Sequence, residues 1–238
     1  MTEVVSALGG AARTRARRSA EGSPDLESAR FERSPLGGSP KRFLDCALAG
    51  ALLVLFAPLM AVIAGAIVLL DGGRPFYSHT RVGYGGRIFG CLKFRTMHRD
   101  ADEILAAHLA KDPEAAREWA EARKLRVDPR VTPVGAFLRR TSLDELPQLL
   151  NVLKGEMSCV GPRPVTREEL PRYDAHAADY LRARPGLTGL WQVTGRSAAD
   201  FPTRVSFDHR YVSTWSFLAD LSILARTPFA VLRGEGAY

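Results

Sequence analysis

The sequence predicts an α+β protein: a re-entrant membrane helix hairpin followed by a mostly helical cytoplasmic domain with a small β element and interfacial helices. Three observations predict this class. An uninterrupted apolar run spans residues 46–70, two β-type runs flank a glycine-rich turn within residues 76–95, and helix-type apolar spacing dominates the remainder. The corresponding division is a disordered tail at 1–40, a re-entrant membrane helix kinked at Pro58 at 41–74, and a cytoplasmic domain at 75–238.

Composition limits the class of partner. The chain has 238 residues, 46% of them hydrophobic, which is enough for one sizeable core beside the membrane element. Its formal net charge of +7 favours an anionic partner, and beside a membrane element acidic lipid and phosphate groups come before nucleic acid. Neither a recognition-helix pattern nor an aromatic-basic stacking platform is visible, so no nucleic-acid partner is expected. The three cysteines, Cys46, Cys91 and Cys159, lack metal-ligand or paired spacing and are expected to be reduced thiols.

The N-terminal residues 1–40 are rich in Ala, Arg, Ser, Gly and Pro and hold few large apolar side chains. Such a composition cannot support a core, so this tail is expected to be disordered. It also lacks the apolar segment of a cleavable signal peptide.

The apolar run lies between Asp45 and Asp71, contains no charged side chain, and has Pro58 at its midpoint. A run longer than about 18 residues is typical of a membrane segment, and a proline inside a helix removes a backbone hydrogen bond and favours a kink. Lys and Arg flank the run on both sides, whereas a spanning helix favours an excess on one side. The pattern favours a hairpin that enters and leaves one membrane face; a single span with a tolerated proline is the alternative.

Two β-type runs, 76–82 and 87–95, flank a glycine-rich turn and predict a hairpin. The stretch carries basic but no acidic side chains. Lys93 and Arg95 are expected to face a phosphate-bearing ligand, and a solvated basic hairpin near acidic lipid is the alternative.

Acidic and basic side chains are concentrated between residues 128 and 156. A predicted helix here has four leucines on one face: Leu146, Leu149, Leu150 and Leu153. Ser142 followed by Glu145 fits a capping box, which would explain the acidic residues without catalysis. However, Asp144 and Glu145 lie at a helix start shortly after Arg139, where free amides and the helix dipole favour a bound phosphate. The local pattern leaves both interpretations open.

Two loops rich in proline and glycine follow, at 161–164 and 184–196. The prolines on either side of Arg163 restrict its backbone in a way that an ordinary surface arginine does not require.

Further segments predict helices without obvious chemistry. Residues 100–126 fit two surface helices with a break at Pro113. Near the C-terminus, Trp215, Phe217 and Phe229 beside basic residues fit an interfacial helix on the membrane, with a plain core helix as the alternative.

Together these motifs resemble the bacterial sugar transferases, the monotopic phosphoglycosyl transferases. The resemblance extends from residue 41 to the C-terminus and rests on motifs in the family's order: Lys93-Phe94-Arg95-Thr96-Met97, Ser142-Leu143-Asp144-Glu145-Leu146-Pro147-Gln148, Gly161-Pro162-Arg163-Pro164, and Arg184-Pro185-Gly186-Leu187-Thr188-Gly189 with Gly195-Arg196. This combination is highly specific. The closing residues 232–238 and the length most resemble the short galactosyl-1-phosphate transferases that start succinoglycan-type exopolysaccharide.

The resemblance implies a reaction and its partners. A sugar 1-phosphate, galactose 1-phosphate in the members most alike, moves from a UDP-sugar to undecaprenyl phosphate with release of UMP and with Mg²⁺ as cofactor. This is the first membrane step of exopolysaccharide synthesis, at the cytoplasmic face of the inner membrane and in contact with membrane lipid. Which UDP-sugar is used stays open, as do homo-oligomerisation and contacts with other polysaccharide-synthesis proteins.

The resemblance also implies residue roles. Asp144 would attack the phosphorus adjoining the sugar and form an aspartyl phosphosugar intermediate, and Glu145 would hold Mg²⁺. Substrate phosphate would be bound by five basic residues: Lys93, Arg95, Arg139, Arg163 and Arg196. The re-entrant hairpin at Pro58 follows the family, although many members have Ser where this chain has Ala57. A non-catalytic, membrane-anchored scaffold that binds acidic lipid or other polysaccharide-synthesis proteins is the rival interpretation.

Overall fold

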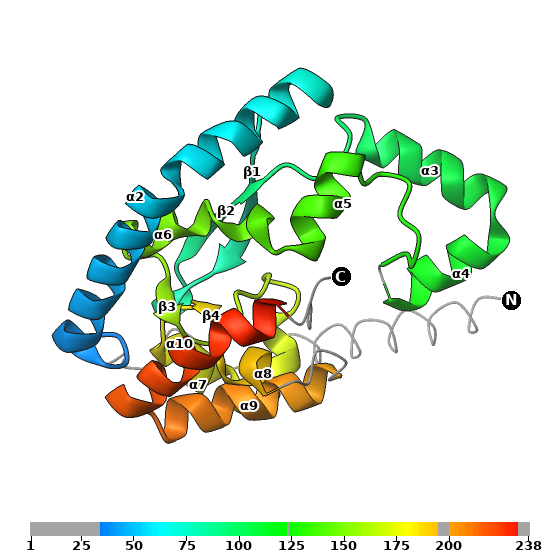
Figure 1. Ribbon diagram of the computed structural model, residues 1–238. Helices are drawn as coiled ribbons and strands as arrows, with labels where there is room; N and C mark the ends of the chain where they lie inside the picture. The colour runs from blue at the N-terminus through cyan, green and yellow to red at the C-terminus, as the bar shows by residue number, and fades with distance from the viewer. Residues whose placement is uncertain (1–33, 123, 195–199, 233–238) are drawn as a thin grey trace, which may run out of the picture. The chain divides into compact units, whose positions relative to one another are not determined.

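Helices and two small sheets alternate along the chain, and the computed structural model describes residues 34–122, 124–194 and 200–232. Most of the predicted disordered tail therefore lies outside the described residues. Figure 1 shows the elements in chain order. Their bounds are α2 (Gly38–Leu70), β1 (Phe76–Val82), η1 (Tyr84–Gly86), β2 (Ile88–Phe94), α3 (Ala101–Lys111), α4 (Pro113–Ala122), α5 (Pro133–Arg140), η2 (Leu143–Glu145), α6 (Gln148–Lys154), β3 (Ser158–Val160), η3 (Leu170–His176), α7 (Ala177–Arg182), β4 (Gly186–Thr188), α8 (Leu190–Val193), α9 (Phe201–Ser213) and α10 (Phe217–Leu232).

The apolar run forms a single helix, α2, that is continuous through Pro58 (Figure 1). The structure does not show the predicted reversal of the chain at Pro58, because a helix can continue past a proline at the loss of one hydrogen bond. By length and composition α2 could cross a membrane, and only 11% of its most apolar window is buried within the protein. A core helix of a soluble protein would be mostly buried, so α2 indicates association with a membrane.

The N-terminal end of α2 is anchored to the domain by polar side chains. Lys41 Nζ lies 2.6 Å from a carboxylate oxygen of Asp220, and both side chains are almost fully buried. One turn later, the buried Asp45 carboxylate accepts a hydrogen bond from the backbone N–H of Cys159 at 2.9 Å. Removal of one partner from such a buried pair is strongly destabilising, so this end of α2 is firmly attached.

The C-terminal end of α2 is attached to the same domain. Ile63 and Ile67 are buried with Leu138 of α5 in a small apolar cluster, and the Thr132 hydroxyl donates a hydrogen bond of 2.8 Å to Asp71 just after the helix. The middle of α2, residues 51–62, contains no buried residue. Both ends of the apolar helix therefore contact one domain, while the side chains of its middle stay at least partly exposed.

The predicted hairpin is confirmed. β1 and β2 pair antiparallel, with Tyr77 opposite Lys93, around the glycine-rich turn. The two predicted surface helices are confirmed as α3 and α4, and Pro113 begins the second of them.

A short parallel sheet joins the two proline- and glycine-rich loops. β3 pairs with β4, and the Gly161 N–H donates a hydrogen bond of 2.9 Å to the Thr188 carbonyl. The backbones approach so closely that a Cβ atom on Gly161 would lie 2.4 Å from the Arg184 carbonyl oxygen, and one on Gly186 would lie 2.1 Å from the Gly161 nitrogen. The glycines are required because no side chain fits there, and they hold Arg163 beside the second loop.

The predicted leucine face of α6 is partly wrong. Leu149 is buried, together with Val152, in the main core, whereas Leu150 and Leu153 are each 39% exposed. The helix α6 begins only at Gln148. Its contacts with α2 and β2 bury the face that carries Leu149 and Val152 in place of the predicted leucine face.

The C-terminal helix α10 packs on the core with one side, and its place on the membrane surface stays a prediction. It buries Asp220 and Ile223 against the core, yet it exposes apolar side chains on the rest of its surface: Phe217, Leu218, Leu221, Phe229, Val231 and Leu232. A contiguous uncovered apolar surface marks an interaction site, and beside an apolar α2 a membrane interface is the natural partner.

Candidate active site

The carboxylate pair lies on a tight turn between α5 and α6. Ser142 adopts a left-handed conformation (φ 56°), and Asp144 and Glu145 follow in the single 3₁₀ turn η2. The Ser142 side chain makes no capping hydrogen bond. The predicted capping box is therefore wrong: the left-handed residue turns the chain before a helix can begin, and α6 starts three residues after Glu145. Because no capping box forms here, a local structural role does not explain the presence of the two acids.

Lys93 joins the two carboxylates. Its Nζ lies 2.6 Å from Glu145 Oε1 and 3.4 Å from Asp144 Oδ2. Lys93 is the penultimate residue of β2, so the hairpin presents its side chain to the turn. The direct partners of Lys93 in the structure are the two acids, and its contact with a phosphate stays a prediction.

Burial and charge separate the two acids. Burial raises the pKa of Asp144, and the adjacent Glu145 raises it further, against the lowering effect of Lys93. Burial would raise the pKa of Glu145 too, but Lys93, Arg163 and a hydrogen bond from Gln148 outweigh it, so the pKa of Glu145 is lowered. Burial opposes the charge of Lys93, yet the two acids raise its pKa. Asp144 is therefore the more basic carboxylate of the pair, and Glu145 is the one held firmly ionised.

Two of the predicted phosphate-binding arginines lie near this pair. Arg139, in the last turn of α5, donates from Nε to Thr96 Oγ1 at 2.9 Å, and its charge acts on Asp144. Arg163 lines a cavity together with Lys93 and Glu145. Its exposed guanidinium forms no ion pair with any residue that the structure describes.

The other two predicted arginines have different positions. Arg95 donates a hydrogen bond to the carbonyl of Gly72, in the loop after α2, so its side chain supports the exit of the apolar helix. Its role as a phosphate ligand stays a prediction. Arg196 lies outside the described residues.

Sequence reasoning missed two glutamines in this cavity. Gln148 contacts Glu145, and both Gln148 and Gln192 line the cavity. The Gln192 Oε1 atom is buried and has no hydrogen-bond partner among the described residues. A buried amide oxygen without a donor is costly, so Gln192 is available to accept from a ligand hydroxyl or N–H group. Both glutamines stand inside or beside the quoted motifs, but only the fold shows that they meet.

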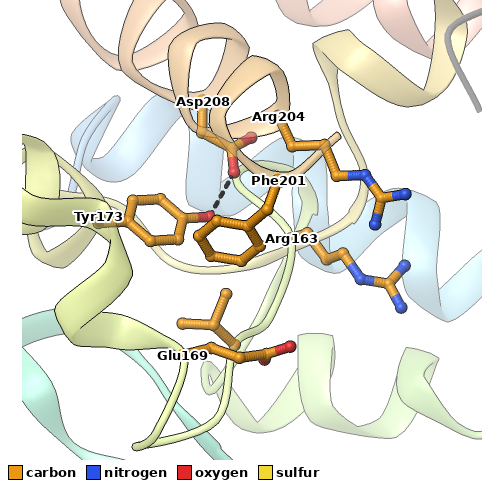
Figure 2. Close-up of a pocket in the computed structure, with 7 residues that line it drawn as sticks. Arg163, Glu169, Tyr173, Phe201, Arg204 and Asp208 are labelled. Carbon is orange, nitrogen blue, oxygen red and sulfur yellow. Dashed lines mark hydrogen bonds between the residues drawn. The ribbon is translucent and has the colours of Figure 1, made fainter. Parts of the chain in front are cut away.

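A second small cavity also has Arg163 in its lining (Figure 2). Seven residues line it: Arg163, Val165, Glu169, Tyr173, Phe201, Arg204 and Asp208. Asp208 is buried on α9 and accepts a 2.7 Å hydrogen bond from the Tyr173 hydroxyl. It also accepts from the backbone N–H of Arg163. Asp208 therefore connects α9 to the backbone of the loop that carries Arg163.

The carboxylate pair is chemically suited to a hard cation. Asp144 and Glu145 supply oxygen ligands, the ligand type that Mg²⁺ prefers. The lowered pKa of Glu145 keeps that carboxylate ionised near neutral pH. Two carboxylates leave most positions for water and substrate phosphate, which is the usual pattern for Mg²⁺.

Comparison with known proteins identifies clear relatives. A family model described as bacterial sugar transferase matches residues 37–234. The chain is 52% identical over 204 residues, 86% of its length and 90% of the relative's, to the exopolysaccharide production protein ExoY of Rhizobium meliloti (strain 1021). It is 50% identical to an undecaprenyl-phosphate galactose phosphotransferase of Salmonella typhimurium (strain LT2), over 83% of the chain and 41% of that protein. It is 43% identical to a UDP-glucose:undecaprenyl-phosphate glucose-1-phosphate transferase of Caulobacter vibrioides, over 83% of the chain and 72% of that protein.

Proposed function

We propose that this chain, which belongs to the bacterial sugar transferase family, transfers a sugar 1-phosphate from a UDP-sugar to undecaprenyl phosphate at the start of exopolysaccharide synthesis. The observation that carries the proposal is the turn at 143–145, where Lys93 contacts two acids and Arg163 opens onto the same cavity. Relatives named for transfer to undecaprenyl phosphate support the lipid acceptor.

The first half of the proposed reaction forms a covalent intermediate. A carboxylate oxygen of Asp144 bonds to the phosphorus next to the sugar, and the bond from that phosphorus to the bridging oxygen of the diphosphate breaks. UMP leaves with that oxygen. The raised pKa of Asp144 supports this role, because a more basic carboxylate is a better nucleophile once ionised.

The second half returns the enzyme to its starting state. A phosphate oxygen of undecaprenyl phosphate bonds to the same phosphorus, and the bond to Asp144 breaks, which restores the carboxylate. Lys93 stays within contact of both acids and offsets their charge while the anionic substrates approach. We propose that Arg163, which lines the cavity, and Arg139, near Asp144, bind phosphate oxygens, a task that suits the planar guanidinium.

We propose that Mg²⁺ binds at Glu145 together with substrate phosphate. When bound, the cation offsets phosphate charge and orients the diphosphate. The chain's own contribution is an ionised Glu145, held by Lys93 and Gln148 beside the nucleophile.

We propose a location at the cytoplasmic face of the inner membrane, with both ends of α2 on that same face. The attachment of both ends of α2 to one domain supports this topology, since a spanning helix would place its ends on opposite sides. Impermeant thiol labelling of intact cells tests it. A cysteine placed before Lys41 should be protected as fully as one in the domain, and external labelling of the first alone would contradict the proposal.

Galactose is the proposed sugar, because the chain resembles galactosyl-1-phosphate transferases. A relative named for glucose transfer keeps UDP-glucose as the competitor to test. The decisive assay measures UMP release from a panel of UDP-sugars with undecaprenyl phosphate, with and without Mg²⁺. Release that depends on the lipid and the metal supports the function, and no release from any UDP-sugar by the membrane-embedded protein would overturn it.

A further inference from the structure

Three potential metal ligands meet on the surface where η3 and α7 contact α9. His176 is the last residue of η3, Asp179 lies in the first turn of α7, and His209 lies on α9. One ligand atom from each of the three side chains lies within 4.8 Å of the other two. None of the three residues lines either cavity at Arg163, so the proposed function leaves this cluster unexplained.

Both imidazoles turn toward the same carboxylate oxygen. His209 Nδ1 lies 2.7 Å from Asp179 Oδ2, and His176 Nδ1 lies 3.7 Å from that same oxygen. A tetrahedral zinc ion with bonds of about 2.0–2.1 Å holds its ligand atoms about 3.3 Å apart, a separation between those two distances. Small side-chain rotations would therefore bring the three atoms around one ion.

Hydrogen bonding explains only one of the two histidines. His209 lies within hydrogen-bond distance of Asp179, whereas His176 lies too far away for such a bond. His176 nevertheless faces the His209 ring, with the ring centroids 4.2 Å apart and the planes tilted by 35°. Two protonated imidazoles at this distance would repel each other, whereas two neutral imidazoles can share one cation.

The two oxygens of Asp179 have different neighbours. Arg182 Nη1 lies 3.9 Å from Oδ1, while both imidazoles lie near Oδ2. Oδ2 can therefore bind an ion while Oδ1 keeps its contact with Arg182. The three ligand side chains are between 25% and 42% exposed, so an ion can reach them from water.

We infer that His176, Asp179 and His209 bind Zn²⁺ or a similar divalent transition-metal ion, with water in the fourth position. Two imidazoles and one carboxylate suit such an ion, whereas Mg²⁺ prefers oxygen ligands alone. Each neutral imidazole would bind through the lone pair of Nδ1 and carry its proton on Nε2. The site is separate from the Mg²⁺ site proposed at Glu145, and it does not depend on the proposed function.

The ion would link two elements that already meet at the Tyr173–Asp208 hydrogen bond (Figure 2). Tyr173 and His176 both belong to η3, and Asp208 and His209 are neighbours on α9. Asp208 also accepts a hydrogen bond from the backbone N–H of Arg163. An ion that binds only the folded state would therefore stabilise the junction that holds the Arg163 loop.

The test uses the full-length protein in nanodiscs, without a histidine tag, stripped of metal by chelation and kept in excess Mg²⁺. Calorimetry with Zn²⁺ should detect one strong site, and Co²⁺ in its place should give the visible absorption bands of a four-coordinate ion. His176→Ala should weaken Zn²⁺ binding by at least about tenfold to a hundredfold, because even changes behind the ligands cost that much. His108→Ala, which alters a partly exposed histidine on α3, should match the wild type.

Thermal unfolding gives a second readout. Zn²⁺ should raise the unfolding temperature of the wild type and of His108→Ala, since the ion binds the folded state. The shift should be lost in His176→Ala and in Asp179→Asn. Hydrogen exchange of the η3 and α9 amides should likewise slow with Zn²⁺ in the wild type and not in His176→Ala.

The remaining outcomes would overturn the inference. Absence of Zn²⁺ and Co²⁺ binding by the wild type at submillimolar concentration would do so, as would equal binding by the wild type and His176→Ala. Loss of binding in Glu145→Gln with full binding in His176→Ala would assign the ion to the carboxylate pair. If Asp179→Asn fails to fold, His176→Ala decides, because His176 forms no hydrogen bond with Asp179. Metal binding is read without turnover, so an inactive transferase that binds Zn²⁺ through His176 would leave this site standing.

Discussion

The two cavities that share Arg163 differ in how their charged groups are arranged. In the first, two carboxylates meet one lysine at 2.6 Å and 3.4 Å, so charge is largely offset within the protein. In the second, Arg163 and Arg204 line the wall together with two acids that have partners of their own: Glu169 pairs with Arg81, and Asp208 accepts a hydrogen bond from Tyr173. The difference indicates a division of labour: the first cavity holds a nucleophile beside its counter-charge, and the second contains the buried Asp208 that contacts the backbone of the loop carrying Arg163.

The largest expected effect comes from removal of the nucleophile in the first cavity. Asp144→Asn keeps the shape of the side chain but removes its nucleophilic charge, so turnover should fall by at least about 10³-fold. Trapping of radiolabelled sugar phosphate on the protein and exchange of labelled UMP into UDP-sugar should both be lost. Glu145→Gln should instead raise the Mg²⁺ requirement. Near-normal UMP exchange by Asp144→Asn would show that Asp144 forms no covalent bond.

A smaller loss is expected from the residue that the two cavities share. Arg163→Ala should reduce kcat/KM by about 10²- to 10³-fold, the usual consequence of losing one preorganised phosphate contact in the transition state. Arg167→Ala is the matched control, because that arginine is also exposed and lies on the same loop but lines neither cavity. Equal kinetics for the two variants would remove Arg163 from the site.

The offset of charge in the first cavity can be tested through pH. Lys93 lowers the pKa of Glu145, so Lys93→Met should raise that pKa and move the acid limb of the kcat/KM profile to higher pH. The activity lost at low pH should then extend further toward neutrality, in a direction that simple loss of packing would not produce. Lys154→Met, an exposed change on α6, should leave the profile in place. An unshifted acid limb would mean that Lys93 does not control the ionisation of Glu145.

The smallest effect concerns Asp208, which holds the loop between the cavities. Burial raises its pKa from 3.8 to about 7. The folded protein therefore keeps a proton there that the unfolded chain releases above pH 4, and this contribution to stability is lost as pH rises from about 4 to 7. Asp208→Asn should remove that decline, so the variant should gain stability relative to the wild type between pH 5 and pH 8. Thermal unfolding at both pH values measures it, and a parallel pH dependence of the two proteins would contradict the shift.

Local patterns in the sequence determined much of this molecule. The hairpin, the two surface helices and the apolar helix follow from alternation, Pro113 and an unbroken apolar run, all of which act over neighbouring residues. The motifs also identified the family, and Asp144, Glu145, Arg139 and Arg163 do lie around one site.

Only the tertiary structure decided how those residues are used. The capping box failed because Ser142 takes a left-handed conformation that no local pattern indicated, and the full leucine face failed because α6 begins only at Gln148 and packs against α2 and β2. The contact of Lys93 with both acids joins positions 51 and 52 residues apart, and Asp208 reaches the Arg163 loop from a separate helix. Attachment of the N-terminal end of α2 to the domain depends on Lys41 meeting Asp220, 179 residues away. Such pairings arise from chain packing across long separations, where periodicity carries no information about which side chains meet.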